Sequence, residues 1–444
     1  NYTLTGGTHN FTVNRRVVGV SGTRLYDATT NAVASDLSTH ANLVGSQTLN
    51  LSGTGTIASK NVGSNKTVSV GTLALADGSN GGLAANYTLT GGTHQLTVNQ
   101  RPLNATLARQ YDGTTASAGS TLSSFNALQG GETLTMTGSG TAASANVANG
   151  ITMSSNGNLA LANGTGAASN YSLNSTVINV TKRVLNSSGS KTYDANTNAL
   201  AGAITLSNLV SGEALNHSGT ATISSANAGS YTISNLSGIS IADGSGGAAS
   251  NYTLTGGTHN FTVNRRVVSV QGSKTYDGNT TISTGNITSV TGTVGSQTLV
   301  ISGGSGTVSA ANVATYSSAA INEGTLTLGN GANGGLASNY TLTGHASSSF
   351  QINQRVLNSS GSRIYDGSTT ASSSDLTLSN LVGSETLTLS GNGTLANANV
   401  ATNKSVTLNT LSIADGSNGG LAANYILAGG THQLSVTQRV LNAT

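Results

Sequence analysis

The most regular group of chemically active residues in this sequence is a Tyr-Asp pair with a basic residue two positions before the tyrosine. On a β-strand these two residues share a face, so the cation can lie over the ring or along it. The aspartate points the other way, into a turn such as "DGTT", where its carboxylate can accept backbone N–H groups. The pattern favours a buried tyrosine anchor and an Asx turn over a shallow binding site. The pairs are Tyr26–Asp27, Tyr111–Asp112, Tyr193–Asp194, Tyr276–Asp277 and Tyr365–Asp366, after Arg24, Arg109, Lys191, Lys274 and Arg363.

Histidines and aspartates recur in loops, but too few share a loop to predict a metal centre. Zinc needs three or four convergent ligands, and each repeat offers at most one histidine after "GGT", at His9, His94, His259 or His432. Calcium loops need several carboxylates. The "ADGS" loops supply one each, which makes Asp77, Asp243 and Asp415 the calcium candidates, and Asn163 and Asn330 replace it in the other two repeats. We expect turns at these positions and no metal site.

Patterns typical of catalysis are also missing. Paired carboxylates of the glycosidase type are not expected from single glutamates at Glu132, Glu213, Glu323 and Glu385. "GNGANG" at Gly329 to Gly334 fits the dinucleotide pattern, but the strand-like "NYTLT" follows it, rather than a helix that would hold a pyrophosphate. We therefore expect no enzyme activity and no cofactor.

These residues lie on an internal repeat of about 85 residues. Tyrosines of the dipeptide "NY" follow this period, at Tyr2, Tyr87, Tyr171, Tyr252, Tyr340 and Tyr425. An arginine stands ten positions before each Tyr-Asp tyrosine, and the series at the junctions is Arg16, Arg101, Arg183, Arg266, Arg355 and Arg439. We predict full repeats at 15–99, 100–181, 182–264, 265–353 and 354–437. Residues 1–14 would be the terminal hairpin of a preceding repeat, and residues 438–444 the first strand of a following one.

Within a repeat, apolar residues alternate with small polar ones, which is the period of a β-strand. In "NYTLTGGTHQLTVN", Tyr87, Leu89, Leu96 and Val98 fall on one face, so the segment predicts a β-hairpin with "GGTH" as its turn. Short strand candidates with frequent turn signals favour Ig-like, Greek-key β-sandwiches. A β-solenoid is the alternative, but its short rungs are not visible in the sequence. We expect an all-β tandem array of about five sandwiches that forms an elongated rod.

The junction between repeats predicts a stiff connection. In "FTVNRRVVGV" the last strand of one repeat runs into the first strand of the next with only a polar pair between them. Few backbone dihedrals are therefore free to act as a hinge, unlike in a Gly/Ser linker. The first 14 residues should need a partner strand from a preceding repeat or a neighbouring chain, and should be disordered without one.

Composition narrows the class of protein further. Charged residues make up 7% of the chain, against about 25% in ordinary domains, and there are 59 Gly, one Pro and no Cys. The net charge of +3 comes without the Lys/Arg clusters that bind nucleic acid. No apolar run approaches the roughly 20 residues that span a bilayer, and the first residues do not read as a signal peptide. We expect no nucleic-acid partner and no membrane span, and any targeting signal would lie outside this segment.

The order of several motifs resembles a known group of repeats. "RQYDGTT" or "KTYDGNT", then "LVGSETLTLSGNGT", "ANV" and "LADGSNGGLAANYTLTGGTHQLTVNQR" are similar to the YDG-type and related glycine-rich, mostly-β tandem repeats of bacterial surface adhesins of the filamentous-haemagglutinin kind. Two repeats depart from the pattern with "YDAT" and "YDAN". The resemblance implies secretion and an extracellular or cell-surface location, and it supplies no catalytic residues.

Together these patterns predict the stalk of a large adhesin, which projects a tip or assembles into extracellular fibres or biofilm matrix. Its partners would be the adjacent repeats of the same chain. Lateral self-association is a further expectation, because low charge and a single proline leave edge strands poorly protected. The alternative is that the repeats themselves bind a glycan or another cell-surface ligand. Ice binding by threonine rows is disfavoured, because the threonine positions shift between repeats.

Overall fold

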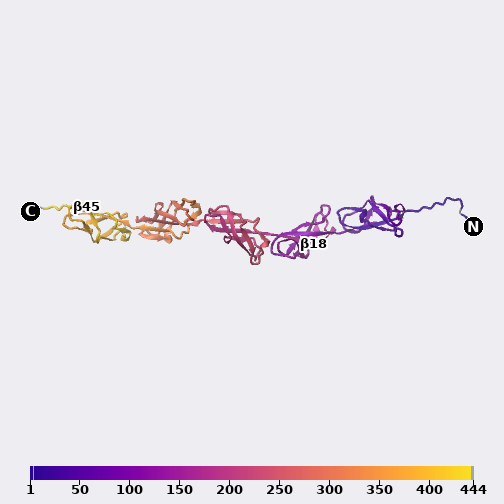
Figure 1. The fold of residues 1–444 in the computed structure, drawn as a ribbon, viewed down its shortest axis with the longest axis horizontal. Coiled ribbons are helices and arrows are strands. Elements are labelled where there is room, and N and C mark those ends of the chain that lie inside the picture. The colour runs from indigo at the N-terminus through magenta and orange to yellow at the C-terminus, as the bar shows by residue number, and fades with distance from the viewer. Residues whose placement is uncertain (4, 442–444) are drawn as a thin grey trace. The chain divides into compact units, whose positions relative to one another are not determined.

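The computed structural model describes residues 1–3 and 5–441, and these form β-strands and short 3-10 helices but no α-helix. Figure 1 draws the chain as a ribbon coloured by residue number from indigo to yellow, and strands occur in every repeat. The chain divides into two compact units, and the division passes through the third repeat. One unit is Asn1–Asn186 with Ser207–Asn216 and Ile241–Gly257, and the other is Ser187–Leu206 with His217–Ser240 and Thr258–Thr444.

The first repeat comprises ten strands. They are β1 (Arg16–Val17), β2 (Gly19–Leu25), β3 (Asn31–Val33), β4 (Thr39–Ala41), β5 (Leu49–Ser52), β6 (Thr54–Ile57), β7 (Gly63–Ser69), β8 (Ala74–Asp77), β9 (Tyr87–Thr88) and β10 (His94–Asn99). Six of them form a curled sheet in the order β3-β6-β7-β10-β2-β4, while β5 pairs with β8 and β1 with β9. Alternate residues of β10 are buried, among them Leu96 and Val98, which is why this sequence forms a strand against a core.

The second repeat has fewer and longer strands, and the third has nine. The second contains β11 (Arg101–Gln110), β12 (Ala116–Ala118), β13 (Leu122–Phe125), β14 (Leu134–Thr137), β15 (Ser139–Ala142), β16 (Ala148–Ser155), β17 (Ala160–Asn163) and β18 (Tyr171–Thr181). The third contains β19 (Arg183–Val184), β20 (Asn186–Thr192), β21 (Asn198–Leu200), β22 (Ile204–Ser207), β23 (Leu215–Ile223), β24 (Gly229–Asn235), β25 (Ile239–Asp243), β26 (Tyr252–Thr253) and β27 (His259–Asn264).

The fourth and fifth repeats follow the same plan. The fourth contains β28 (Arg266–Val267), β29 (Ser269–Thr275), β30 (Thr281–Ser283), β31 (Ile287–Thr291), β32 (Leu299–Gly303), β33 (Ser305–Val308), β34 (Ala314–Ser317), β35 (Ile321–Asn322), β36 (Thr327–Asn330), β37 (Tyr340–Thr341) and β38 (Ser349–Asn353). The fifth contains β39 (Arg355–Val356), β40 (Asn358–Ile364), β41 (Thr370–Ser372), β42 (Leu376–Ser379), β43 (Leu387–Ser390), β44 (Asn392–Leu395), β45 (Ala401–Thr407), β46 (Ser412–Asp415), β47 (Tyr425–Ile426) and β48 (His432–Thr437).

Short 3-10 helices connect some of these strands, and several of them stand directly before the "NY" tyrosine. They are η1 (Ala34–Asp36), η2 (Ala84–Asn86), η3 (Gly119–Thr121), η4 (Ala168–Asn170), η5 (Ala201–Ala203), η6 (Ala249–Asn251), η7 (Thr284–Asn286), η8 (Ser318–Ala320), η9 (Ala337–Asn339), η10 (Ser373–Asp375) and η11 (Ala422–Asn424). The expectation of tandem all-β repeats is confirmed. Within residues 1–3 and 5–441, none of the helices has the length and apolar character of a bilayer-spanning segment.

In every repeat the first and last long strands of the sheet are parallel neighbours. β2 pairs with β10, β11 with β18, β20 with β27, β29 with β38, and β40 with β48. The register is continuous for ten residues of β11, with one bulge after Leu103. Because the two strands run in the same direction, the chain enters a repeat at one end of the sheet and leaves it at the other.

The predicted β-hairpin in "NYTLTGGTHQLTVN" is wrong. β9 and β10 do not pair with each other: β9 pairs with β1, and β10 pairs with β2 and β7. β9 and β10 are two parts of one strand, and the residues "TGGT" loop out between them. In the second repeat, which lacks "GGT", the same segment is the unbroken strand β18. A strand with an excursion gives the same alternation as a hairpin, so the pattern could not separate them. Gly92 is needed there, since a Cβ would come within 2.2 Å of the Val18 carbonyl oxygen.

The two ends of the described chain contain no strands. Asn1–Arg15, apart from residue 4, contains no strand, and the side chains of Tyr2, Phe11 and Val13 are exposed. The assignment of residues 1–14 to a preceding repeat stays a prediction. Of the predicted strand at 438–444, residues 442–444 lie outside the described residues, and residues 438–441 contain no strand.

Candidate functional site: the interface between repeats

The tyrosine of each Tyr-Asp pair lies at the end of a repeat where the chain leaves it. Tyr26 follows β2, and its N–H donates to the Asn99 carbonyl at the end of β10, over 2.9 Å. The same bond joins the other four tyrosines to the last residue of the parallel strand: Tyr111 to Thr181, Tyr193 to Asn264, Tyr276 to Asn353 and Tyr365 to Thr437. The ring therefore has a fixed place at the start of the next repeat.

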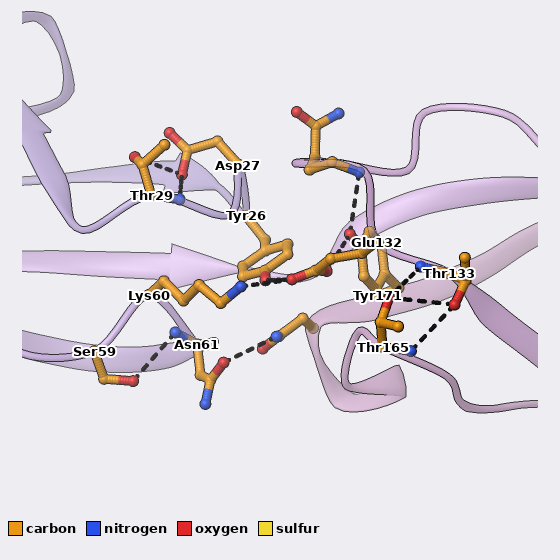
Figure 2. A network of polar contacts seen from close by, with 12 residues as sticks. Tyr26, Asp27, Thr29, Ser59, Lys60, Asn61, Glu132, Thr133, Thr165 and Tyr171 are labelled. Atoms are coloured by element: carbon orange, nitrogen blue, oxygen red, sulfur yellow. Dashed lines mark hydrogen bonds and ion pairs between the residues drawn. The ribbon is translucent and has the colours of Figure 1, made fainter.

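There the ring meets the "NY" tyrosine of the following repeat. The rings of Tyr26 and Tyr171 pack edge to face, with centroids 5.2 Å apart and planes at 77°. Their hydroxyls donate to the two oxygens of one carboxylate, Glu132, over 2.7 and 2.8 Å, as Figure 2 shows. We call this arrangement of two tyrosines and one bridging side chain the tyrosine clasp. It joins the core of the first repeat to the second, because Tyr171 belongs to the same buried cluster as Val18 and Leu96.

The clasp recurs at each of the four interfaces between repeats. Glu213 accepts from Tyr111 and Tyr252 over 2.6 Å each. Glu385 accepts from Tyr276 over 2.7 Å and from Tyr425 over 2.6 Å. Ring centroids at these two interfaces and the remaining one are 5.5, 5.3 and 5.3 Å apart, with planes at 77 to 79°. The paired tyrosines are at most 5% exposed.

The interface between the third and fourth repeats uses an amide in place of the carboxylate. Gln297 donates through Nε2 to the Tyr193 hydroxyl over 3.0 Å, and its Oε1 accepts from the Tyr340 hydroxyl. An amide has both donors and acceptors, so it satisfies both buried hydroxyls without a charge. In the first repeat the same position is Gln47, which accepts from Tyr87.

The asparagine of each "NY" dipeptide closes the interface beside the clasp. Asn170 Oδ1 accepts the Val62 N–H over 2.9 Å, and its Nδ2 donates to Asn61 Oδ1 over 3.0 Å. Asn251, Asn339 and Asn424 make the same two contacts with the repeat before them, and all four side chains are 0 to 1% exposed. Asn86, whose repeat has none before it in the described chain, is exposed. The "NY" dipeptide is thus an interface element as well as a period marker.

The glycine of "YDG" also lies at an interface. Gly113 has φ +79°, and a Cβ on it would come within 2.8 Å of Val210 Cγ1 in the next repeat. Gly278 stands in the same relation to Val382. In the two departing repeats, Ala28 and Ala195 hold the left-handed backbone at φ 64° and 62°. The turn therefore tolerates alanine, and it is packing against the following valine that fits glycine at Gly113 and Gly278.

Burial and hydrogen bonding shift the ionisation of the clasp. Burial raises the pKa of Tyr171, Tyr252, Tyr276 and Tyr425 to about 12, and the carboxylate that each hydroxyl contacts adds to this effect. Burial alone would raise the pKa of Glu132 too, but hydrogen bonds from Lys60, Tyr26 and Tyr171 hold it below its usual range. Lys60 Nζ lies 2.6 Å from Glu132 Oε1 and 5.9 Å from the centre of the Tyr26 ring.

The basic residue before each Tyr-Asp pair binds the aspartate rather than the tyrosine ring, which replaces the predicted cation–ring contact. Arg24 donates to Asp27 over 2.8 Å and to the Thr29 carbonyl over 2.7 Å. Arg109, Lys191, Lys274 and Arg363 form ion pairs with Asp112, Asp194, Asp277 and Asp366. Each aspartate also accepts the N–H two residues later, at Thr29, Thr114, Asn196, Asn279 and Ser368. This is the predicted Asx turn, and the ion pair holds the turn against the strand that carries the basic residue.

The junction arginines lie at the start of each repeat and hold its neighbouring loop. Arg16, Arg183 and Arg355 bind the carbonyl and side chain of Asn42, Asn208 and Asn380, and Arg266 binds the Gly292 carbonyl. Arg101, Arg183 and Arg355 also reach back to the carbonyl of the preceding clasp tyrosine, at Tyr26, Tyr111 and Tyr276. Arg439 lines a cavity of about 450 Å³ beside Tyr365 and Val400.

The loop aspartates and buried histidines have hydrogen bonds that fix turns. Asp77, Asp243 and Asp415 each accept one backbone N–H over 2.7 Å, and Asn163 and Asn330 accept the corresponding N–H over 2.8 Å. A role that asparagine fills equally well does not require a carboxylate. His94 and His432 close the "GGT" excursion through the Leu89 and Leu427 carbonyls. Within residues 1–3 and 5–441, no three His, Asp or Glu side chains converge as a metal group would.

Sequence reasoning missed the bridging residue of the clasp. It treated the four glutamates alike, whereas Glu132, Glu213 and Glu385 lie at interfaces and Glu323 pairs with His345 inside the fourth repeat. The available signal was "GSQTL", "GGETL", "SGEAL", "GSQTL" and "GSETL", one per repeat, in which only Glu or Gln occupies the third position.

A comparison with known protein families identifies the same repeats. The sequence profile of the YDG domain matches residues 10–95, 93–178, 179–259, 262–349 and 352–432. A comparison with curated proteins finds no similar sequence. The five matches cover most of the chain and follow the repeats of the structure, so the chain belongs to the YDG domain family and carries five consecutive copies of the domain.

Proposed function

We propose that this chain is a stalk segment of a large secreted or surface-displayed bacterial adhesin. In this role it projects a tip domain or assembles with other chains into extracellular fibres or matrix, and it has no enzymatic activity. The observation that carries the proposal is the tyrosine clasp, which recurs at four consecutive interfaces with both hydroxyls bound. Buried, specific contacts at every junction are what a chain needs if its repeats must not rotate freely.

The connection between repeats supports the same role. A single residue separates the last strand of one repeat from the first strand of the next, such as Gln100 between β10 and β11. Arg101 then binds back to the Tyr26 carbonyl over 2.7 Å. A Gly/Ser linker would leave many dihedrals free at this place, whereas here the backbone is held on both sides.

The parallel strands also suit a segment that carries tension. A force along the chain pulls the start of β11 and the end of β18 in opposite directions. Since these strands are parallel neighbours over ten register pairs, their ladder is loaded in shear and its hydrogen bonds must break together. An antiparallel terminal pair would instead open one bond at a time.

The alternative, that each repeat binds a glycan, has less support. Glycan sites need exposed aromatic rings, and the clasp tyrosines are buried at the interfaces between repeats. Glycan binding is therefore an outcome of the test and not a second proposal.

Single-molecule stretching of the full chain tests the stalk role. We expect five similar unfolding events, each with a contour gain of roughly 240 to 280 Å, given about 85 residues at 3.3–3.6 Å per residue less a folded length of ~30–40 Å. Unfolding below the force resolution would contradict a tension-bearing role. Saturable binding of the chain to a glycan array, or an exclusively cytosolic location in the producing cell, would contradict the passive and extracellular parts of the proposal.

A further inference from the structure

The four clasps place pairs of tyrosine rings in a geometry suited to covalent coupling. In each pair one ring comes from the exit end of a repeat and the other from the following repeat. Ring centroids 5.2 to 5.5 Å apart put the ring carbons in van der Waals contact. Where the bridge is a glutamate, both hydroxyls donate to the same carboxylate, so the two phenol oxygens lie beside one group.

The carboxylate is also placed to remove a proton from either ring. The Tyr26 and Tyr171 hydroxyls lie 2.7 and 2.8 Å from Glu132 Oε1 and Oε2, which is the reach required of a general base. Loss of an electron makes a phenol strongly acidic, so an acceptor already bound to the hydroxyl makes oxidation of the ring easier.

We propose that the three glutamate clasps are sites of oxidative tyrosine coupling, which joins neighbouring repeats by dityrosine bonds. The pairs are Tyr26–Tyr171, Tyr111–Tyr252 and Tyr276–Tyr425. The inference depends on the interface alone and goes beyond the stalk role. A chain linked in this way keeps its repeats joined even when the strands around the clasp open.

The reaction balances with a one-electron oxidant. Each tyrosine loses one electron to the oxidant and one proton from its hydroxyl, which passes to the glutamate and then to water. The two phenoxyl radicals form one carbon–carbon bond between ortho positions, and the two ring hydrogens at those carbons move to the oxygens. With hydrogen peroxide as the terminal oxidant, acting through a metal centre, one peroxide takes up the two electrons and two protons and yields two water molecules.

Burial directs the coupling to the partner ring. Tyr26 and Tyr171 are 0 and 2% exposed, so the ring of another chain cannot approach a radical formed there. Tyr2 and Tyr365 are 107 and 40% exposed, and radicals on these two rings would couple between chains or react with solvent species.

The third interface is a natural control for the role of the carboxylate, because its bridge is an amide. At the third interface Tyr193 and Tyr340 have the same ring geometry, 5.3 Å and 77°, but Gln297 is their bridge. An amide is a poor proton acceptor, so this pair should couple more slowly although its rings are equally close.

The test is oxidation of the full chain with photochemically generated ruthenium(III), followed by trypsin digestion and mass spectrometry. Cleavage after Lys and Arg separates the partners, so that each bond joins a distinct pair of peptides. Those pairs are 25–60 with 110–182, 110–182 with 192–265, 192–265 with 275–355, and 275–355 with 405–439. Each linked pair is lighter than its two peptides by two hydrogen atoms.

We expect the three glutamate-bridged pairs in severalfold excess over the 192–265 with 275–355 pair. Glu132→Gln should lower the yield of the first link to the level of the natural glutamine interface, and Gln297→Glu should raise the third. The other links in the same molecule serve as internal standards if a variant alters folding. Equal yields at glutamate and glutamine interfaces, links only through Tyr2 or Tyr365, or no links at all would each overturn the proposal.

Discussion

The first and third interfaces between repeats have the same geometry but different chemistry. At the first, the Glu132 carboxylate is bound by Tyr26, Tyr171 and Lys60. At the third, the uncharged amide of Gln297 binds Tyr193 and Tyr340. The centroid distances, 5.2 and 5.3 Å, and the 77° angle are preserved. What the interface requires is therefore a polar bridge that satisfies two buried hydroxyls, while charge is an addition that makes one interface sensitive to pH.

The largest effect should come from removing a clasp ring. Tyr26→Ala leaves a cavity beneath Tyr171 and should reduce local stability by about 3–5 kcal/mol, as for other buried aromatic truncations. Tyr365→Ala is the matched control, because Tyr365 occupies the same position but is 40% exposed, and it should cost less than half as much. Hydrogen exchange by mass spectrometry over the affected repeats measures both. Similar losses would mean that the following repeat adds nothing to the anchor.

Removing the bridge should have the next largest effect, and it separates polarity from charge. Glu132→Ala leaves the Tyr26 and Tyr171 hydroxyls without their acceptor and should cost about 1–3 kcal/mol for each buried hydroxyl left unpaired. Glu132→Gln should cost about 1 kcal/mol or less, the size of one hydrogen bond's net contribution, since Gln297 performs the same task in the third interface. If the glutamine variant is as damaging as the alanine variant, charge and not polarity holds the first interface.

A methyl group on the YDG glycine tests packing between repeats. Gly113→Ala brings a Cβ against Val210, whereas Gly367→Ala meets nothing within 4 Å at a similar φ of +77°. Both variants carry the strain of the left-handed backbone, so their difference isolates the interface. We expect Gly113→Ala to cost about 1–3 kcal/mol more, as overpacking does, in chemical denaturation followed by hydrogen exchange. No difference would show that Val210 moves aside freely.

Replacing the asparagine of an "NY" dipeptide by alanine should have a smaller effect on stability. The size of this effect should depend on whether a repeat precedes the asparagine. Asn170→Ala removes the acceptor of the Val62 N–H and should cost about 1–3 kcal/mol. Asn86→Ala changes an exposed residue and should stay within about 0.5 kcal/mol. Exchange of the Val62 amide, followed by NMR, measures the first loss directly. Unchanged protection at Val62 in Asn170→Ala would contradict the assigned bond.

The smallest expected effect is a difference in how the stability of the first and third interfaces depends on pH. Because the pKa of Glu132 is depressed in the folded state, its stabilisation is complete above the unfolded pKa of about 4.3 and is lost as the pH falls through the folded value. The tyrosine pKa values near 12 are raised, so that their contribution is complete below about pH 10 and is lost as the pH rises toward 12. Hydrogen-exchange protection of the Val62 N–H, measured as a function of pH, should fall in acid in the natural chain. It should not fall in this way in Glu132→Gln.

The sequence predicted the repeat, its all-β character and the Asx turn because these are local or periodic features. Alternation in β10 and the Asp27 turn each depend on residues a few positions apart. The hairpin was wrong because alternation does not say which strand is the neighbour: β10 pairs with β2, more than 70 positions earlier.

The clasp was missed for a related reason. Its three residues, Tyr26, Glu132 and Tyr171, come from two repeats and are up to 145 positions apart, since 171 − 26 = 145. The bridge is Glu at the first, second and fourth interfaces and Gln at the third, so a search for charged groups alone does not find it. It becomes visible only in the structure, where the two buried hydroxyls need hydrogen-bond partners.

The most direct test of the central claim, that the clasp couples neighbouring repeats, is a double-mutant cycle across the first interface. Tyr26→Ala, Tyr171→Ala and the double variant would be compared in the full chain by the exchange protection of the Val62 N–H, which lies inside this interface. The clasp predicts a coupling free energy of about 0.5–3 kcal/mol, as for residues in contact. Additive losses from the two single variants would contradict it.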